Sequence, residues 1–315
     1  MTKKIIVVFG ATGAQGGGLA NAILNDPNSE FTVRAVTRDL TSDKSKALAA
    51  KGAELVVANV DDPTSVHKAM QGAYGAFCVT FFWTHFSPEK EMEQVKIMAD
   101  AAKAAGVKHV IWSTLEDTRK FVPLHDNSMP TLNGKYKVPH FDGKGESDQF
   151  FIQAGVPTTF LLASYYWDNL IHFGMGPKRG ADGKLAITFP MGNKKMAGIA
   201  SEDIGKCAYG IFKNSDKYIG KRVGIAGEQL TLADMATKLG KALGEEVTYN
   251  SVTPEQYRGF GFPGAEDLGN MFQFYADFDK EFVQWRDVDA SKTLNPELKS
   301  FDTWLSTNAK SIPLS

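Results

Sequence analysis

A glycine-rich turn between an apolar strand and a helix constrains the fold of this chain more than any other feature. Residues 5–9 are all apolar, which is the pattern and length of a buried parallel strand. Gly10, Gly13 and Gly16 follow at a spacing of three, and residues 19–24 then have helical apolar spacing. A strand, a glycine turn and a helix in this order are the setting of a dinucleotide-binding fingerprint.

The three glycines have separate physical roles in such a turn. Gly10 permits the tight turn off the strand, Gly13 lets backbone N–H groups approach a pyrophosphate, and Gly16 lets the helix pack close to the strand. The N-terminus of the helix then offers free N–H groups and the positive end of its dipole to the phosphates. We therefore predict nucleotide binding at this turn.

The alternation of strands and helices continues after the turn. We predict further strands and intervening helices at residues 31–38, 43–52, 53–60, 65–71, 76–80, 88–105 and 109–114. Five alternations predict an α/β fold with a doubly wound parallel sheet. Residues 115–139 break the pattern with prolines and few apolar side chains, so we expect a surface excursion there.

The second half of the chain has a less regular pattern. It contains a predicted helix that ends at Gln153, a sixth strand at 158–163, a helix at 201–212 and a strand at 222–226. We predict a nucleotide-binding domain over residues 1–155. Residues 156–315 are predicted to form a smaller C-terminal α/β domain, from which some elements return to the main sheet.

Composition and charge argue against several classes of protein. The 315 residues carry a formal net charge of −1, which argues against nucleic acid or an anionic membrane surface as a main partner. No apolar run approaches the roughly 20 residues of a membrane span, and a strand begins too early for a signal peptide. Two distant cysteines and six histidines without ligand spacing predict buried thiols, no metal and a cytoplasmic protein.

The end of the second predicted strand bears on the type of dinucleotide. A site for NAD usually has Asp or Glu here, but this chain has Thr37-Arg38. Arg38 can lie beside a 2′-phosphate and Thr37 can hydrogen-bond to it, with Lys44 or Lys46 as further charges. A solvated arginine is the alternative, and Asp39 follows directly. We predict that NADP(H) is preferred over NAD(H).

The ends of the next two strands are also expected to border the ligand. Val60 ends the third strand and Asp61 follows it, and both are placed beside the adenine, although Asp61 or Asp62 can instead cap the next helix. Thr80 and the aromatic residues 81–83 end the fourth strand. These aromatic side chains either wall the cofactor cleft or pack in the core.

Several motifs resemble one family over nearly the whole chain. The glycine turn at residues 10–17, Thr37-Arg38, the His-Phe-Asp-Gly-Lys-Gly-Glu motif at 140–146 and the segments 261–268 and 270–275 are similar to the NmrA-like atypical short-chain dehydrogenases. Within that family the chain resembles the HSCARG-type NADPH sensors. The resemblance implies a Rossmann domain, NADP(H) binding and a redox-sensing role in which the NADPH/NADP ratio changes assembly or partner binding.

The resemblance also implies roles for individual residues. The phosphates would be held by Gly10, Thr12, Gly13, Ala14, Gln15, Gly16 and Arg38. The ribose and nicotinamide side would be lined by Thr80, Phe81 and Phe82, with Lys144 bonded to the ribose. The nicotinamide would be covered by Tyr166, Trp167 and Asn169. One departure is Glu93, which stands where the family carries a lysine.

The same family resemblance raises the question of catalysis. Short-chain dehydrogenases usually place a tyrosine four residues before a lysine on one helical face, with a serine at the end of the fifth strand. Ser113 and Lys144 are present here, but His140 stands at the tyrosine position. Either His140 is structural, or His140 or Lys144 donates a proton. Tyr136 is an outside candidate.

Two functions therefore remain open at the level of the sequence. The missing tyrosine favours an NADP(H)-binding redox sensor with little or no turnover, which acts as a monomer or homodimer on a regulatory protein partner. Nuclear access would fit such a role. The alternative is an NADPH-dependent oxidoreductase that reduces a small carbonyl, quinone or enone. The aromatic residues of 165–167 and 257–278 favour this alternative if they line a pocket.

Overall fold

Seven parallel strands form the main sheet of the computed structural model, which describes residues 2–314. They are β1 (Lys4–Val8), β2 (Phe31–Thr37), β3 (Glu54–Val57), β4 (Gly75–Cys78), β5 (His109–Thr114), β6 (Thr158–Leu162) and β11 (Arg222–Gly224). Their order across the sheet is β11-β6-β5-β4-β1-β2-β3, and every neighbouring pair is parallel. The predicted doubly wound α/β fold is therefore confirmed.

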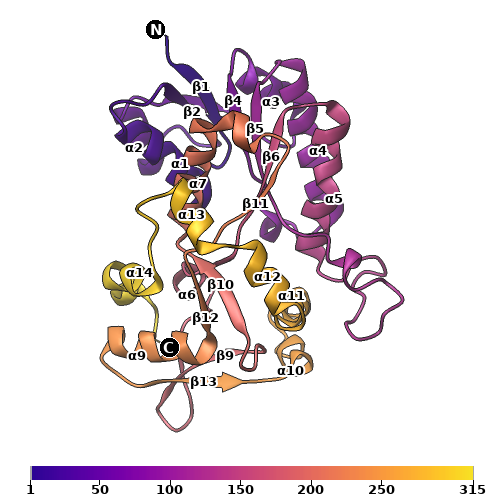
Figure 1. Ribbon diagram of the computed structural model, residues 1–315, viewed down its shortest axis with the longest axis vertical. Coiled ribbons are helices and arrows are strands. Elements are labelled where there is room, and N and C mark those ends of the chain that lie inside the picture. Colours follow the sequence, from indigo (N-terminus) through magenta and orange to yellow (C-terminus); the bar gives the residue numbers. More distant parts are fainter. Residues whose placement is uncertain (1, 315) are drawn as a thin grey trace.

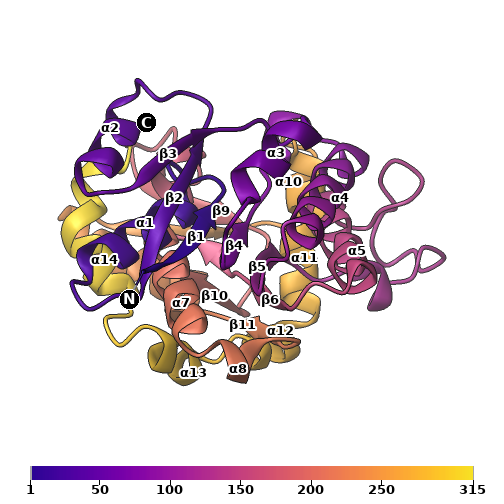
Figure 2. The ribbon, with the colours of Figure 1, turned by 90° about the horizontal axis from the view of Figure 1, so that it is seen from above.

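Helices cover both faces of this sheet (Figures 1 and 2). One face carries α1 (Ala14–Asn25), α7 (Ser201–Lys213) and α13 (Val288–Leu294), with α2 (Asp43–Ala50) beside β3. The other face carries α3 (Pro63–Met70), α4 (Pro88–Ala104) and α5 (Pro139–Ala154), packed side by side. Burial on both faces explains the unbroken apolar run of β1, in which Ile6, Val7 and Val8 are inaccessible to solvent.

The lower half of the molecule in Figure 1 is built from the rest of the chain. Two small sheets have the orders β12-β10-β7 and β13-β9-β8. Their strands are β7 (Tyr165–Tyr166), β8 (Lys178–Arg179), β9 (Leu185–Phe189), β10 (Lys195–Ile199), β12 (Glu228–Thr231) and β13 (Val247–Ser251).

Helices pack around these small sheets. They are α6 (Asn169–His172), α9 (Leu232–Leu243), α10 (Pro254–Arg258), α11 (Ala265–Asp277), α12 (Asp279–Trp285) and α14 (Phe301–Asn308). The short helix α8 (Ser215–Tyr218) instead lies against α7, and the 3-10 turns are η1 (Phe82–Thr84), η2 (Thr118–Lys120) and η3 (Ala309–Ser311). Elements β6, β11 and α7 from this part of the chain return to the main sheet. The domain boundary at residue 155 stays a prediction.

The segment 115–139 is more than the predicted surface excursion. Met129, Lys137 and Val138 are buried, and the Lys137 ammonium donates hydrogen bonds to the carbonyls of Asp126 and Met129. The side-chain amide of Asn270 donates to the carbonyls of Pro130 and Lys137. Buried donors satisfy these carbonyls, so a segment with few apolar residues can still pack against the protein.

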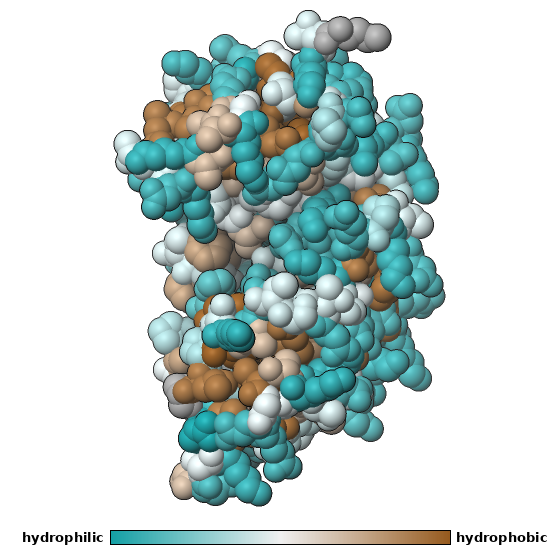
Figure 3. Space-filling model, turned by 90° about the vertical axis from the view of Figure 1, so that its left-hand side faces the viewer, coloured by the Kyte–Doolittle hydropathy of each residue, from teal (hydrophilic) through white to brown (hydrophobic). Residues whose placement is uncertain are grey.

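The face of the molecule that Figure 3 shows is mostly polar. Figure 3 shows apolar residues gathered in two areas, one on the upper half and one on the lower half of this face. Among residues 2–314, no helix combines the length and the apolar character that a membrane crossing requires.

Two glycines allow α1 and α7 to cross at close range. A Cβ atom at Gly205 would overlap backbone atoms of Gln15 and Leu19, and one at Gly18 would overlap the backbone of Glu202. The contact joins a helix from the start of the chain to a helix from its second half. Gly17 lies next to Gly18 on α1, but a Cβ atom there meets its nearest neighbour, the Ala11 carbonyl oxygen, at 3.4 Å.

We predict that two glycine substitutions on these helices differ in their effect on stability. Gly205→Ala forces the two helices apart and should lower the free energy of unfolding by roughly 1–3 kcal/mol. Gly17→Ala adds a better helix former without overlap and should leave stability unchanged or raise it by up to about 1 kcal/mol. Urea denaturation of both variants measures the difference, and equal effects would contradict the tight crossing.

Candidate functional site

A large cavity opens at the carboxyl ends of the central strands. Its volume is about 1530 Å³, above the roughly 300–1,000 Å³ of most small-molecule sites. It begins at the glycine turn after β1, passes the ends of β2, β4 and β5, and reaches residues of α10 and α11. Ligands of open parallel sheets bind at this edge. Residues from both halves of the chain therefore line this cavity.

Gly10 and Gly16 have the local structure that their expected roles in the glycine turn require. Gly10 adopts a left-handed conformation with φ +63°, and its carbonyl accepts a 2.8 Å hydrogen bond from the N–H of Gly13. A Cβ atom at Gly16 would overlap the Gly10 carbonyl, so this glycine allows α1 to pack on the turn. Gly13 lines the cavity, and a Cβ atom there would approach only the backbone of Gly10.

The N-terminus of α1 is left uncapped by side chains. Ser42, Asp62 and Ser87 accept hydrogen bonds from the first turns of α2, α3 and α4, whereas Gly13 offers α1 no such bond and its first turn has no acidic residue. The first N–H groups of a helix have no partner within the helix. Because Thr12 and Ala14 also line the cavity, these donors lie at its wall.

Gln15 links two other residues of the cavity wall. Its amide oxygen accepts a 2.7 Å hydrogen bond from the Ser113 hydroxyl, and its amide nitrogen donates to the Tyr166 hydroxyl. Burial raises the pKa of Tyr166 to about 12. Ser113, a catalytic candidate from the sequence, lines the cavity, but its hydroxyl proton is directed to Gln15.

Arg38 and Thr37 both line the cavity, but they differ in whether their side chains already have hydrogen-bond partners. Arg38 is exposed, and no described residue forms a hydrogen bond or an ion pair with its guanidinium. The Thr37 hydroxyl is already bonded within the loop to Asp39 and Ser45. The Asp39 carboxylate accepts hydrogen bonds from the hydroxyl and the N–H of Thr41, and these bonds lower its pKa. Neither Asp39 nor the predicted helper lysines at 44 and 46 line the cavity.

Of the two aspartates after β3, one caps the next helix and the other lines the cavity. Asp62 is the N-cap of α3 and accepts a 3.0 Å hydrogen bond from the N–H of Thr64. Asp61 lines the cavity with Val60, and the Gln94 amide and the Lys90 ammonium hold the pKa of its carboxyl below the usual value. Glu93 lies outside the cavity lining and pairs with Lys90.

Lys144 on α5 is held by a buried polar pair. Its ammonium lies 2.7 Å from the Thr80 hydroxyl and 3.0 Å from Oε1 of Glu91, and it lies over the ring of Trp112. Thr80 donates a 2.6 Å hydrogen bond to the same Glu91 oxygen. The Glu91 side chain is fully buried, and its Oε2 has no hydrogen-bond partner among the described residues. Lys144 is thus the counter-ion of a buried carboxylate.

His140 lies one helical turn before Lys144 and also lines the cavity. Its Nδ1 is 2.6 Å from Oδ1 of Asp267 on α11, and its backbone N–H donates to Oδ2 of the same carboxylate. The ring lies 4.8 Å from that of Trp83, between centroids. A carboxylate at Nδ1 fixes the proton there. Nε2 has no hydrogen-bond partner among residues 2–314.

The start of α5 is tightly packed at its two glycines. A Cβ atom at Gly143 would lie 3.1 Å from Pro88, and one at Gly145 would overlap the backbone of Asp117. The glycines allow neighbouring segments to approach the helix.

Tyr136 is wrong as a candidate proton donor, because its hydroxyl donates to Glu89 and it does not line the cavity.

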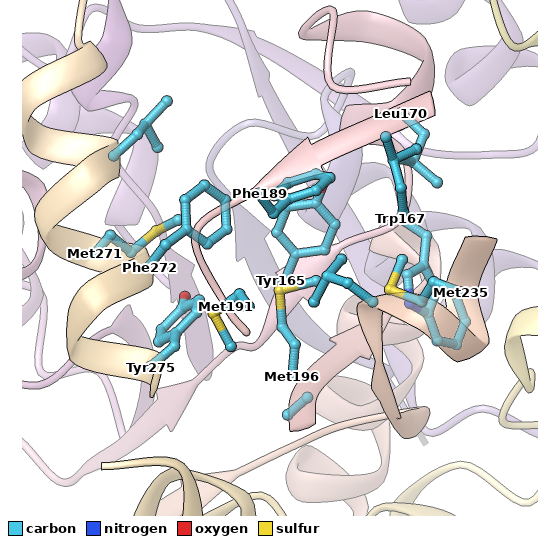
Figure 4. Close-up of a cluster of buried hydrophobic side chains, with 14 of the residues drawn as sticks. Tyr165, Trp167, Leu170, Phe189, Met191, Met196, Met235, Met271, Phe272 and Tyr275 are labelled. Atoms are coloured by element: carbon cyan, nitrogen blue, oxygen red, sulfur yellow. The ribbon is translucent and has the colours of Figure 1, made fainter. Parts of the chain in front are cut away.

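The loop after β6 contributes some of the predicted residues but not all. Tyr166 and Asn169 line the cavity, as do Phe81 and Phe82 after β4. Trp167 does not, and its predicted position over the cofactor is wrong. Its side chain is 1% exposed and packs against Phe301 in the core of the lower half (Figure 4). Gly198 makes room for it, since a Cβ atom there would overlap the indole.

Two polar residues of the site were missed from the sequence. Asp267 lies within the motif at 261–268, but nothing local connects it with a histidine 127 residues earlier. Glu91 stands in the first turn of α4, where an acidic residue is ordinary. Among the described residues there is no group of three or more His, Cys, Asp or Glu side chains that could hold a metal ion.

The chain belongs to the NmrA-like family, whose model matches residues 2–305. An NmrA-like family domain-containing protein of Dictyostelium discoideum is 29% identical over 313 residues, which are 97% of each chain. The protein FrzB of Cladobotryum sp, named an NmrA-like family domain-containing oxidoreductase, is 28% identical over 86% of this chain and 83% of its own. The predicted family is therefore confirmed.

Solved structures share the fold. NmrA, a negative transcriptional regulator solved in complex with NADP, superposes with a TM-score of 0.77 at 22% identity and covers 98% of this chain and 95% of its own. The same regulator has also been solved with NAD. A triphenylmethane reductase of Citrobacter sp. complexed with NADP(H) has a TM-score of 0.73 at 19% identity, over 97% and 99% of the two chains.

A buried carboxylate holds the start of α5 and should be essential for stability. Asp142 accepts hydrogen bonds from the N–H and hydroxyl of Thr118 and from the N–H groups of Lys137 and Val138. Asp142→Ala leaves these buried donors without partners and should cost about 3 kcal/mol or more. Asp100→Ala, which removes an exposed ion pair with Lys96, should cost under about 1 kcal/mol. Thermal unfolding distinguishes the two; similar small losses would contradict the anchoring role.

Proposed function

We propose that this chain binds NADP(H) and is an NADPH-dependent reductase of an organic carbonyl compound. The observation that supports this most strongly is the pair formed by His140 and Asp267 at the wall of the cavity. The carboxylate orients the imidazole through Nδ1 and leaves Nε2, which has no partner among the described residues, free to exchange a proton with a bound molecule.

The residues at the glycine turn fit a dinucleotide. The uncapped start of α1 provides backbone donors, and Gly13 leaves the space that a pyrophosphate requires. Arg38, without a partner among the described residues, supports a 2′-phosphate and hence NADP(H) over NAD(H). Asp61 and Val60 border the adenine side, and Thr80 and Lys144 the nicotinamide ribose side.

The proposed chemistry divides between the cofactor and the protein. The bound dinucleotide supplies the hydride. His140 donates the proton from Nε2 to the substrate oxygen, and the Asp267 carboxylate stabilises the charged imidazole before that transfer. Hydride and proton together convert a carbonyl to an alcohol. Lys144 binds and orients, because its ammonium stays between Thr80 and Glu91.

A redox sensor that acts through a protein partner is the second candidate. The observation in its favour is the absence of a tyrosine four residues before Lys144. We rank it below the reductase because aromatic residues of the segment 257–278, such as Tyr257 and Tyr275, line the cavity beyond His140. Space for a second molecule is what a reductase requires.

Substitution of Arg38 tests the cofactor. Arg38→Ala should weaken NADPH binding by roughly 1.5–3 kcal/mol more than NADH binding, because only NADPH has the 2′-phosphate. Isothermal titration with both cofactors measures this, and Lys46→Ala outside the cavity should change neither affinity. Equal small losses for NADPH and NADH would remove Arg38 from the phosphate site.

Substitution of His140 tests the reductase. NADPH oxidation with a panel of quinones and enones should fall at least about 100-fold in His140→Ala, while the NADPH affinity changes little. The exposed His125 provides a control, and His125→Ala should retain full activity. If the wild-type protein binds NADPH but none of the quinones and enones in the panel causes it to be oxidised, the sensor is the better proposal.

A further inference from the structure

The cavity continues past His140 into a region that we call the aromatic chamber. Its buried wall is made of Tyr165, Phe189, Tyr257, Met271 and Tyr275. Figure 4 shows Tyr165 beside Phe189, with Met271 and Tyr275 on α11 at the other side. Tyr165 and Phe189 pack edge to face with their centroids 6.1 Å apart. These side chains form a rigid apolar wall, which favours an apolar ligand.

Exposed phenylalanines gather at this same cavity. Among the described residues, all phenylalanines with largely exposed side chains line it, and they are Phe81, Phe86, Phe173, Phe260 and Phe262. They come from three separate segments of the chain. Large aromatic side chains that stay exposed in one place are typical of a binding site rather than of random surface.

Two of these segments are brought together by a glycine. A Cβ atom at Gly264 would lie 2.9 Å from the Trp83 ring and 3.4 Å from the Phe86 ring. The loop that carries Phe260 and Phe262 therefore packs directly against the segment after β4. Since Trp83 also lies beside His140, the aromatic side chains extend from the proton donor to the outer part of the chamber.

Two tyrosine hydroxyls of the chamber have no partner. Tyr257 and Tyr275 are 4% and 3% exposed, and neither hydroxyl forms a hydrogen bond with any residue of the described chain. Burial raises the pKa of both phenols, so they remain neutral donors. Neither hydroxyl is among the buried polar atoms that lack a partner, so both are accessible from the cavity and can donate to an acceptor oxygen of a ligand.

The five residues that form the buried wall of the chamber carry no charged side chain. The carboxylate of Asp168 accepts a 2.8 Å hydrogen bond from the N–H of Ser201, and Asp267 is paired with His140. Lys178 and His172 are exposed and lie among the lining residues of the outer part. A charged ligand buried against the apolar wall would lose its hydration without an ionic partner.

We propose that the aromatic chamber binds an uncharged, flat, multi-ring conjugated carbonyl compound of the quinone or enone class. Its rings lie against the aromatic side chains, and its carbonyl oxygens accept hydrogen bonds from Tyr257 and Tyr275. This proposal rests on the proposed reductase and specifies its substrate class.

Equilibrium binding to the NADP-saturated protein tests the chamber without requiring turnover. 1,4-Naphthoquinone should bind at least about tenfold more tightly than 1,4-benzoquinone, because its second ring contacts the apolar wall. A sulfonated naphthoquinone should bind more weakly than the uncharged compound. The double variant Tyr257→Phe/Tyr275→Phe should weaken naphthoquinone binding about tenfold. Tyr249→Phe is the matched control, because Tyr249 bonds to Phe189 and does not line the cavity.

The possible results separate the chamber from the reductase. Naphthoquinone that binds as described but is not reduced would support the chamber and overturn the reductase. Reduction of small carbonyls without measurable naphthoquinone binding would overturn the chamber alone. Tighter binding of the sulfonated compound, or unchanged binding in the double tyrosine variant, would also overturn it.

Discussion

The close approach of α1 to its two neighbours is the constraint on which the rest of the structure depends. Gly16 allows the start of this helix to lie on the Gly10 carbonyl, and Gly18 and Gly205 allow its middle to touch α7. The same helix therefore presents its free N–H groups to the cavity and fastens the second half of the chain to the main sheet. A larger side chain at any of these positions would overlap backbone atoms and force α1 away from one of these neighbours.

A second joint between the halves is made by α11. Its residues Asp267, Asn270 and Gln273 recur at a spacing of three and share one face, from which they bond to His140, Lys137 and Ser128. Met271 and Tyr275 on the same helix line the cavity. One helix thus orients the histidine and forms a wall of the aromatic chamber. The position of His140 and the shape of the chamber are therefore set together.

The sequence predicts what depends on local pattern and misses what depends on distant packing. Apolar period and glycine spacing are local, so the parallel sheet and the turn at Gly10 could be predicted. The partner of His140 could not, because Asp267 reaches it only after α11 has packed on the start of α5. Trp167 gave no local sign of burial either, since its space is created by Gly198 on a neighbouring strand. The same limit applies to Lys137, a charged residue whose burial is compensated by backbone carbonyls.

The replacement of a tyrosine by His140 changes what the lysine on the same helix has to do. A tyrosine has an ordinary pKa near 10 and needs a nearby positive charge to act as an acid or base at neutral pH. A histidine titrates near neutrality without that help. Lys144 can then pair with Glu91, whose buried carboxylate lies 3.0 Å from the Lys144 ammonium. Loss of the lysine proton would leave that carboxylate buried and unpaired, which is costly. The pairing of Lys144 thus supports the proposed proton transfer through His140, whose carboxylate partner Asp267 lies on α11.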